Sequence, residues 1–396
     1  MTTKLRAASF QDGAVTTAKI AADAVTNPKI ADDAVQDENF ASSVNLGRRN
    51  LIINGNFQCW QRSTSETGLG ASAGYFTADR WRISTGNSAG RFTMNRTAGD
   101  PDGFNYGLVI NCTTADTSIA ANETMLIQQK IEGQDLQHLK KGTSGAESVT
   151  ISFYAKIVGS ATDFVVTLYD NDNNRFISKL FTFTTSWVRY YFTVPGDTTG
   201  TLDQDTSSSL ELWIWLHAGS NHTSGTLQTS WGSDTNANRA VGIDSIYSST
   251  DNEFYLAGVQ MELGSEATPF EHRSFGEELQ LCKRYFQVLA DGSRSQNEAI
   301  CAGTYYTASI LFHSVVLPVE MRAQPTMVTT NGTNYYITFA NGGGDHHDAI
   351  ARSGNSSKSV VEITAETNVS GTAGHACFTR IGGTSSDAKC MFDAEL

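Results

Sequence analysis

Residues 211–217 have the sequence Glu-Leu-Trp-Ile-Trp-Leu-His, with an unbroken apolar run between the glutamate and the histidine. Successive side chains of a β-strand point to opposite faces of its sheet. The aliphatic residues therefore share one face, and Trp213, Trp215 and His217 share the other. Two apolar faces leave two alternatives for the tryptophans: a buried second layer or an open aromatic surface.

Similar alternating runs recur on both sides of this stretch, separated by turn clusters such as Asp-Asn-Asp-Asn-Asn at 170–174 and Pro-Gly-Asp at 195–197. Consecutive strands without intervening helices indicate antiparallel β-structure, so we predict a β-sandwich over residues 45–273. The predicted strands are residues 148–157, 163–170, 176–184, 188–194, 209–217 and 253–263.

Composition excludes several classes of protein. The 20 Phe, 13 Tyr and 6 Trp argue against disorder, and 35 Gly with 17% charged residues is typical of β-structure rich in turns. A net charge of −13 without a cluster of Lys or Arg argues against a nucleic-acid partner. No apolar stretch approaches the length of a membrane span, so we expect no membrane insertion.

The six cysteines form no Cys-x-x-Cys pair, and the first residues are not followed by the apolar run of a signal peptide. We therefore expect free thiols and assembly in a reducing cytoplasm.

A ten-residue repeat occupies residues 11–40 and offers too little apolar surface to fold alone. We predict that it winds around other copies of the chain as a trimeric shaft; the alternative is a disordered linker. The residues predicted to face the shaft axis are Val15, Ile20, Val25, Ile30, Val35 and Phe40.

A helix is predicted over residues 274–289, because Ser274 and Glu277 form a capping box. Its apolar residues form two stripes, one for the sandwich and one for two sister helices. Residues 290–396 return to β patterns and are predicted to form a C-terminal β-rich tip domain.

Two blocks of sequence carry a family resemblance. The first holds Asn-Leu-Ile-Ile-Asn-Gly-Asn-Phe at 50–57, Trp-Gln-Arg at 60–62 and Ala-Asp-Arg-Trp at 78–81. The second holds Gly-Val-Gln-Met-Glu-Leu-Gly-Ser at 258–265, Ala-Thr-Pro-Phe-Glu at 267–271 and Gly-Glu-Glu-Leu-Gln-Leu-Cys-Lys-Arg-Tyr-Phe at 276–286. In this order they resemble the carbohydrate-binding-module-like jelly roll of bacteriophage tail fibres, over roughly residues 45–330.

The resemblance implies a homotrimeric tail fibre of the virion. Residues 1–44 would attach to tail proteins (an adaptor, a nozzle or a portal-proximal protein), with Leu5 and Phe10 as candidate anchors. The jelly roll and the C-terminal tip would bind a glycan or protein receptor on the bacterial surface. The alternatives are a short tailspike depolymerase that cleaves host polysaccharide, and a structural adaptor that carries a separate receptor-binding protein.

Two candidate binding sites follow from residue types. Trp213 and Trp215 would form a platform for sugar stacking if their face of the strand is open. His346 and His347 lie in a glycine-flanked stretch predicted to be an exposed loop, and three copies in a trimer would offer ligands for a transition metal. The alternative is a polar loop tip.

Enzyme motifs such as His-Glu-x-x-His and the phosphate-binding glycine loop are absent from the sequence. We therefore expect no catalytic residues and no cofactor.

Overall fold

The computed structural model describes residues 48–98, 101–383 and 385–396. The predicted attachment residues Leu5 and Phe10 and the shaft residues of the repeat lie outside this part of the chain and stay predictions. Residues 48–396 group into one compact unit. No helix of the described residues has the length and apolar character that crossing a membrane requires.

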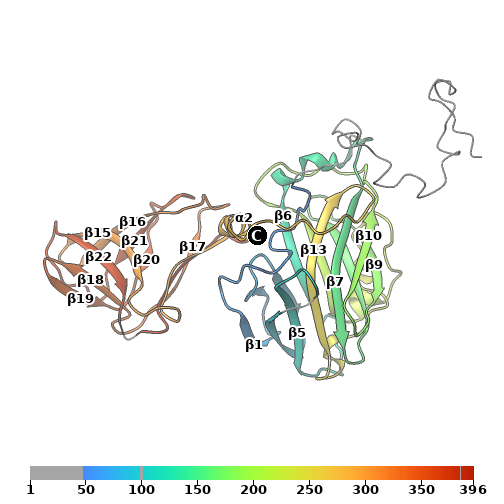
Figure 1. The fold of residues 1–396 in the computed structure, drawn as a ribbon, viewed down its shortest axis with the longest axis horizontal. Coiled ribbons are helices and arrows are strands. Elements are labelled where there is room, and N and C mark those ends of the chain that lie inside the picture. Colours follow the sequence, from blue (N-terminus) through green and yellow to red (C-terminus); the bar gives the residue numbers. More distant parts are fainter. Residues whose placement is uncertain (1–47, 99–100, 384) are drawn as a thin grey trace, which may run out of the picture. The chain divides into compact units, whose positions relative to one another are not determined.

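Two antiparallel sheets form the sandwich, with β13 and β7 side by side in the first (Figure 1). The order in the six-stranded sheet is β1 (Ser65–Leu69), β4 (Arg91–Ala98), β5 (Tyr106–Thr114), β13 (Glu253–Leu263), β7 (Val149–Val158) and β10 (Val188–Val194). The order in the seven-stranded sheet is β12 (Gly232–Ser233), β9 (Arg175–Thr182), β8 (Asp163–Asp170), β11 (Ser208–Ala218), β6 (Thr124–Glu132), β3 (Arg82–Gly86) and β2 (Gly74–Tyr75). These non-sequential orders are those of a jelly roll and confirm the predicted antiparallel sandwich.

The core of the sandwich lies between the two sheets, where inward residues of β4, β5 and β13 meet those of β6, β8 and β11. Leu212, Ile214 and Leu216 belong to this core, as alternation predicted. Short helical turns occur in the connections: η5 (Gly133–Asp135), η6 (Gln137–Leu139), α1 (Ser220–Thr223), η7 (Asn236–Asn238) and η8 (Ile246–Ser248).

The predicted helix begins where expected and ends early. α2 (Phe275–Lys283) has the complete capping box, with the Glu277 N–H donating to the Ser274 hydroxyl at 3.3 Å. The prediction that it continues to residue 289 is wrong, because β14 (Phe286–Asp291) pairs with β23 (Lys389–Asp393). A partner strand this distant in sequence is not visible in a local apolar pattern, and strand pairing overrides helical spacing here.

The region after β14 is β-structure, as predicted. β14, β23 and β17 (Thr326–Thr330) form one sheet. A second sheet has the order β19 (Gly343–His347), β18 (Tyr336–Ala340), β22 (Ala376–Ile381), β15 (Ala299–Thr307), β16 (Ile310–Val316), β21 (Val360–Ala365) and β20 (Ala351–Arg352). A separate hydrophobic cluster fills this region.

The two sequence blocks meet in the structure. Asn50 donates from Nδ2 to the carbonyl of Val259 at 3.1 Å and accepts from the N–H of Met261 at 3.0 Å. The Asn54 N–H donates to a carboxylate oxygen of Glu278 at 2.6 Å. The motif residues are therefore mainly structural, since they join the start of the sandwich to its last strand and to α2.

Gly258 occupies a bulge of β13 at φ +56°. A residue with a side chain would strain the backbone at this φ, and neighbouring side chains leave no space for a Cβ atom. A Cβ there would lie 2.5 Å from Cζ of Phe104. We expect Gly258→Ala to lower the free energy of unfolding by about 2 kcal/mol, from strain and overpacking together. Gly264→Ala, also at positive φ but in open space, is the control and should cost about half as much. Chemical denaturation measures both, and equal losses would contradict the packing argument.

Candidate functional site

Trp213 and Trp215 do not form an open platform, so that prediction is wrong for this chain. Trp213 is 8% exposed and stacks on the ring of Tyr169 at 4.2 Å, while Trp215 is 1% exposed. Residues from the 218–243 segment complete this second cluster on the outer face of the seven-stranded sheet. With their ring faces covered by protein, the two tryptophans leave no room for a sugar.

His346 and His347 lie on β19, a strand where a loop was predicted. His347 is fully buried and its Nε2 lies 3.0 Å from the hydroxyl of Thr338, whereas His346 is exposed on the opposite face. One chain therefore cannot place both rings on one ion. A site made by three copies stays a prediction.

Among the described residues, one group of three side chains has the spacing of metal ligands: Cys59, Asp79 and Cys282, all buried. Burial raises the pKa of Asp79 to about 6. Its two carboxylate oxygens accept hydrogen bonds from the backbone and side chain of Gln61 at 3.1 and 2.9 Å. This carboxylate therefore already has partners and serves the packing of the loop on α2.

Part of the outer face of the six-stranded sheet is open, whereas the outer face of the seven-stranded sheet carries the cluster of Trp213 and Trp215. Strand register aligns side chains of five strands in one row across it, of which the central one is buried and the other four are partly or fully exposed. Along the row, from β1 to β7, these are Ser65, Asn95, Val109, Tyr255 and Lys156. A continuous row on one face can contact an extended ligand.

Aromatic rings occupy one end of this row. The rings of Trp187 and Tyr255 lie 6.1 Å apart at 77°, and both are partly exposed. The Lys156 ammonium lies 4.5 Å from the Tyr255 ring centre and 5.3 Å from that of Trp187. Tyr191 of β10 is 57% exposed and pairs with Ser152 of β7, further along the same face. The ammonium fixes the two rings in place through cation–π attraction.

Polar groups lie in the adjacent row, where Glu253 of β13 pairs with Asn111 of β5. Glu253 accepts from the Tyr255 hydroxyl at 2.5 Å and from Nδ2 of Asn111 at 3.2 Å. Burial raises the pKa of Tyr255 to about 12, and the Glu253 carboxylate adds to the effect, so the hydroxyl keeps its proton. These residues belong to a depression of about 460 Å³, lined by Thr64, Ser65, Asn95, Arg96, Thr97, Val109, Asn111, Glu253 and Tyr255.

Aromatic rings beside fixed amides and a carboxylate suit a pyranose, whose C–H face stacks on a ring while its hydroxyls form hydrogen bonds. Sequence reasoning did not select these residues. Their only signal was the alternation of residues 253–263, which cannot say which face of a sheet stays open.

Comparisons with known proteins find similar solved structures. A structure described as "CBM4 structure and function" has a TM-score of 0.28 and 14% identity, covering 53% of this chain and 98% of that one. TmCBM61 in complex with beta-1,4-galactotriose has a TM-score of 0.28 and 9% identity, covering 55% of this chain and 99% of that one. The enzymatically active domain of bacteriophage CBA120 tailspike protein 4 has a TM-score of 0.27 and 11% identity, covering 54% of this chain and 21% of that one.

No family model matches the chain, and no curated protein matches it. At such low TM-scores and identities, the structural similarities carry no argument about function.

Proposed function

We propose that this chain binds a host-surface glycan with the open face of its six-stranded sheet, as a subunit of a trimeric bacteriophage tail fibre. One observation carries the glycan site: Trp187 and Tyr255, with the Lys156 ammonium between them, form a partly exposed aromatic pair beside Glu253 and Asn111. The fibre role is supported by the sequence resemblance of the two blocks.

In this proposal a sugar ring stacks on Tyr255 or Trp187, and its hydroxyls donate to Glu253 and accept from Asn111. Such contacts are weak singly, because water competes for every hydroxyl. Three copies held by the N-terminal shaft would raise the effective concentration of each site for a repetitive polysaccharide. Residues 1–44 would attach the fibre to the tail, so recognition would not depend on them.

The test uses Trp187→Ala and Tyr255→Ala against purified bacterial surface polysaccharides and intact host cells. We expect each variant to weaken glycan binding about tenfold, because a stacked ring contributes about 1–1.5 kcal/mol. Isothermal titration and a cell-binding assay measure the loss.

Tyr306→Ala is the matched control, since Tyr306 is 64% exposed but belongs to the tip. Unchanged binding in both sheet variants, with loss in the Tyr306 variant, would move recognition to the tip. We propose binding without cleavage, so release of reducing ends from the polysaccharide would favour the depolymerase alternative.

A further inference from the structure

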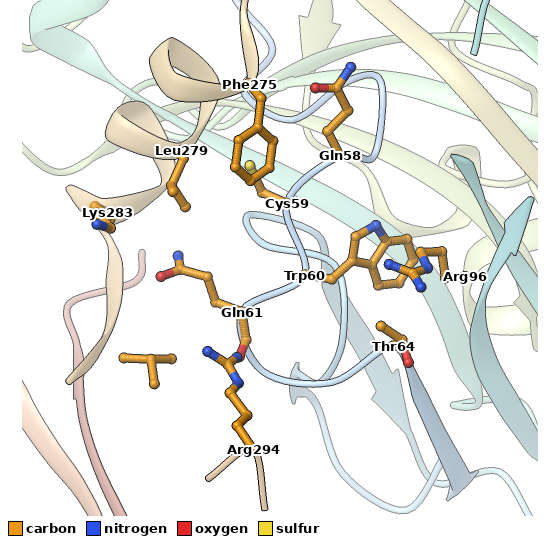
Figure 2. A pocket seen from close by; sticks show the side chains of 11 residues that line it. Gln58, Cys59, Trp60, Gln61, Thr64, Arg96, Phe275, Leu279, Lys283 and Arg294 are labelled. Atoms are coloured by element: carbon orange, nitrogen blue, oxygen red, sulfur yellow. The ribbon is translucent and has the colours of Figure 1, made fainter. Parts of the chain in front are cut away.

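A second cavity adjoins the open sheet face, and it is a groove of about 490 Å³ (Figure 2). Its walls come from the 58–61 loop, from α2 and from the segment around β14. The eleven lining residues are Gln58, Cys59, Trp60, Gln61, Thr64, Arg96, Phe275, Leu279, Lys283, Val288 and Arg294.

The groove is cationic, although the whole chain carries a net charge of −13. Its lining includes Arg96, Lys283 and Arg294 and not one carboxylate. Within the described part of the chain, Arg96 and Lys283 form no ion pair. Arg294 has Asp291 at 3.6 Å and remains 46% exposed. Arg96 and Lys283 are therefore the two cations of the groove without a carboxylate partner, and such cations around a depression attract an anion from solution.

The groove also offers apolar surface. Phe275 is 56% exposed at the start of α2, and Trp60, which is 9% exposed, also lines the groove. The Arg96 guanidinium lies 4.3 Å from the ring centre of Tyr106, which holds it on the β4 side of the groove. A ligand with an apolar face and a negative group would find both kinds of contact here.

The groove is continuous with the depression on the sheet face, because Thr64 and Arg96 line both. The Arg96 side chain leaves β4 on the face opposite to that of Asn95, so a chain of sugars that extends from Tyr255 past Asn95 would enter the groove by passing Thr64 at the edge strand β1. An isolated anion site would not need this continuity, whereas a polymer site would.

We infer that the ligand is an anionic polysaccharide. Its neutral sugars lie on the sheet face, and its carboxylate or phosphate groups lie in the groove, between Arg96 and Lys283 with Arg294 nearby. This inference rests on the proposed glycan-binding function and adds the charge of the ligand. It is a local property, since the net charge alone would repel an anionic polymer.

The experiment compares the full-length chain with an Arg96→Gln, Lys283→Gln double variant. The probes are polygalacturonate for carboxylate, a glycerol-phosphate teichoic acid for phosphate, and dextran as a neutral polymer. We expect the chain to prefer at least one anionic polymer, and the double variant to lose about tenfold in affinity for it. Binding should also weaken with salt in the parent and less so in the variant.

Lys179→Gln is the control, because Lys179 is exposed on the seven-stranded sheet and its substitution removes one positive charge outside the groove. Dextran binding equal to that of both anionic polymers, or an unchanged double variant, would overturn the inference while leaving glycan binding intact. If Tyr255→Ala also has no effect on any polymer, the proposed function itself fails. If the double variant loses trimer mass in light scattering while Lys179→Gln does not, the groove is a contact between copies and the inference is wrong.

Discussion

Replacing Arg80 with alanine is expected to lower the free energy of unfolding by about 3–5 kcal/mol, which is a large part of the stability of most domains. The Arg80 side chain is 1% exposed and forms an ion pair with Glu395, which is itself buried. Its guanidinium lies 3.4 Å from the ring centre of Tyr285 and donates to the carbonyl of Lys130 at 2.6 Å. Burial disfavours the charge of Arg80, but Glu395 raises its pKa overall.

The substitution costs stability because it leaves the buried Glu395 carboxylate without its ion-pair partner. Without Arg80, the Glu395 carboxylate keeps Arg62 as its one cationic partner among the described residues; Nη2 of Arg62 lies 3.3 Å away and is shared with Asp393 at 3.0 Å. A buried carboxylate with too few partners is expensive, whereas removing both charges is much cheaper. The Arg80→Ala, Glu395→Gln double variant should therefore be more stable than Arg80→Ala alone.

Urea denaturation of Arg80→Ala, of Glu395→Gln and of the double variant gives this coupling directly. Arg82→Ala is the control, since Arg82 lies on β3 nearby but is only partly buried and bonds to Gln128. We expect it to cost less than about 1 kcal/mol. Similar losses for Arg80→Ala and Arg82→Ala would show that Arg80 does not have the structural role described.

Acidification below pH 6.5 is the second change with a large expected effect, and it acts on the tip. His313 is 2% exposed, and burial with repulsion from His347 lowers its pKa from 6.5 to about 4. Its Nε2 lies 2.7 Å from the Thr379 hydroxyl, which lies 2.6 Å from that of Thr338. Thr338 contacts Nε2 of His347, so one buried chain links the two rings.

Acid lowers the stability because the unfolded chain binds a proton at His313 at a higher pH than the folded chain does. Between pH 6.5 and about 4 the unfolded chain protonates His313 while the folded chain keeps it neutral. Stability from this group is therefore complete above pH 6.5 and falls by about 1.4 kcal/mol per pH unit below it, reaching a loss of about 3 kcal/mol at pH 4. Burial also lowers the pKa of His347, which adds in the same direction.

Hydrogen exchange of β16, β18 and β22 as a function of pH reports this loss locally. His313→Gln keeps a polar side chain but cannot titrate, so its profile should be flatter by about the same slope. His346→Gln is the control, since His346 is exposed beside His347. A His313→Gln profile that parallels the parent would mean that other groups cause the acid sensitivity.

Some features of this protein could be predicted from local patterns. Alternation placed Leu212, Ile214 and Leu216 in the core, since the period of a strand depends on the backbone alone. The start of α2 was predicted from Ser274 and Glu277, because a capping box lies within one turn. The six cysteines are free, as their spacing indicated.

Other features depend on residues far apart in sequence. The end of α2 was predicted wrongly because β23 pairs with Phe286–Asp291 from the far end of the chain. The roles of Arg80 and Glu395 were not predicted, because an ion pair across 315 residues leaves no local pattern.

The candidate site shows most clearly the difference between what local sequence patterns predict and what contacts between distant residues decide. The sequence by itself determined that this is an antiparallel β-sandwich with many aromatic residues, since residue type and period set local structure and apolar content. It could not distinguish Trp213 and Trp215, which are covered by the 218–243 segment, from Trp187 and Tyr255, which are not. Only the tertiary structure decided which face of which sheet is open, because burial depends on what packs against a strand.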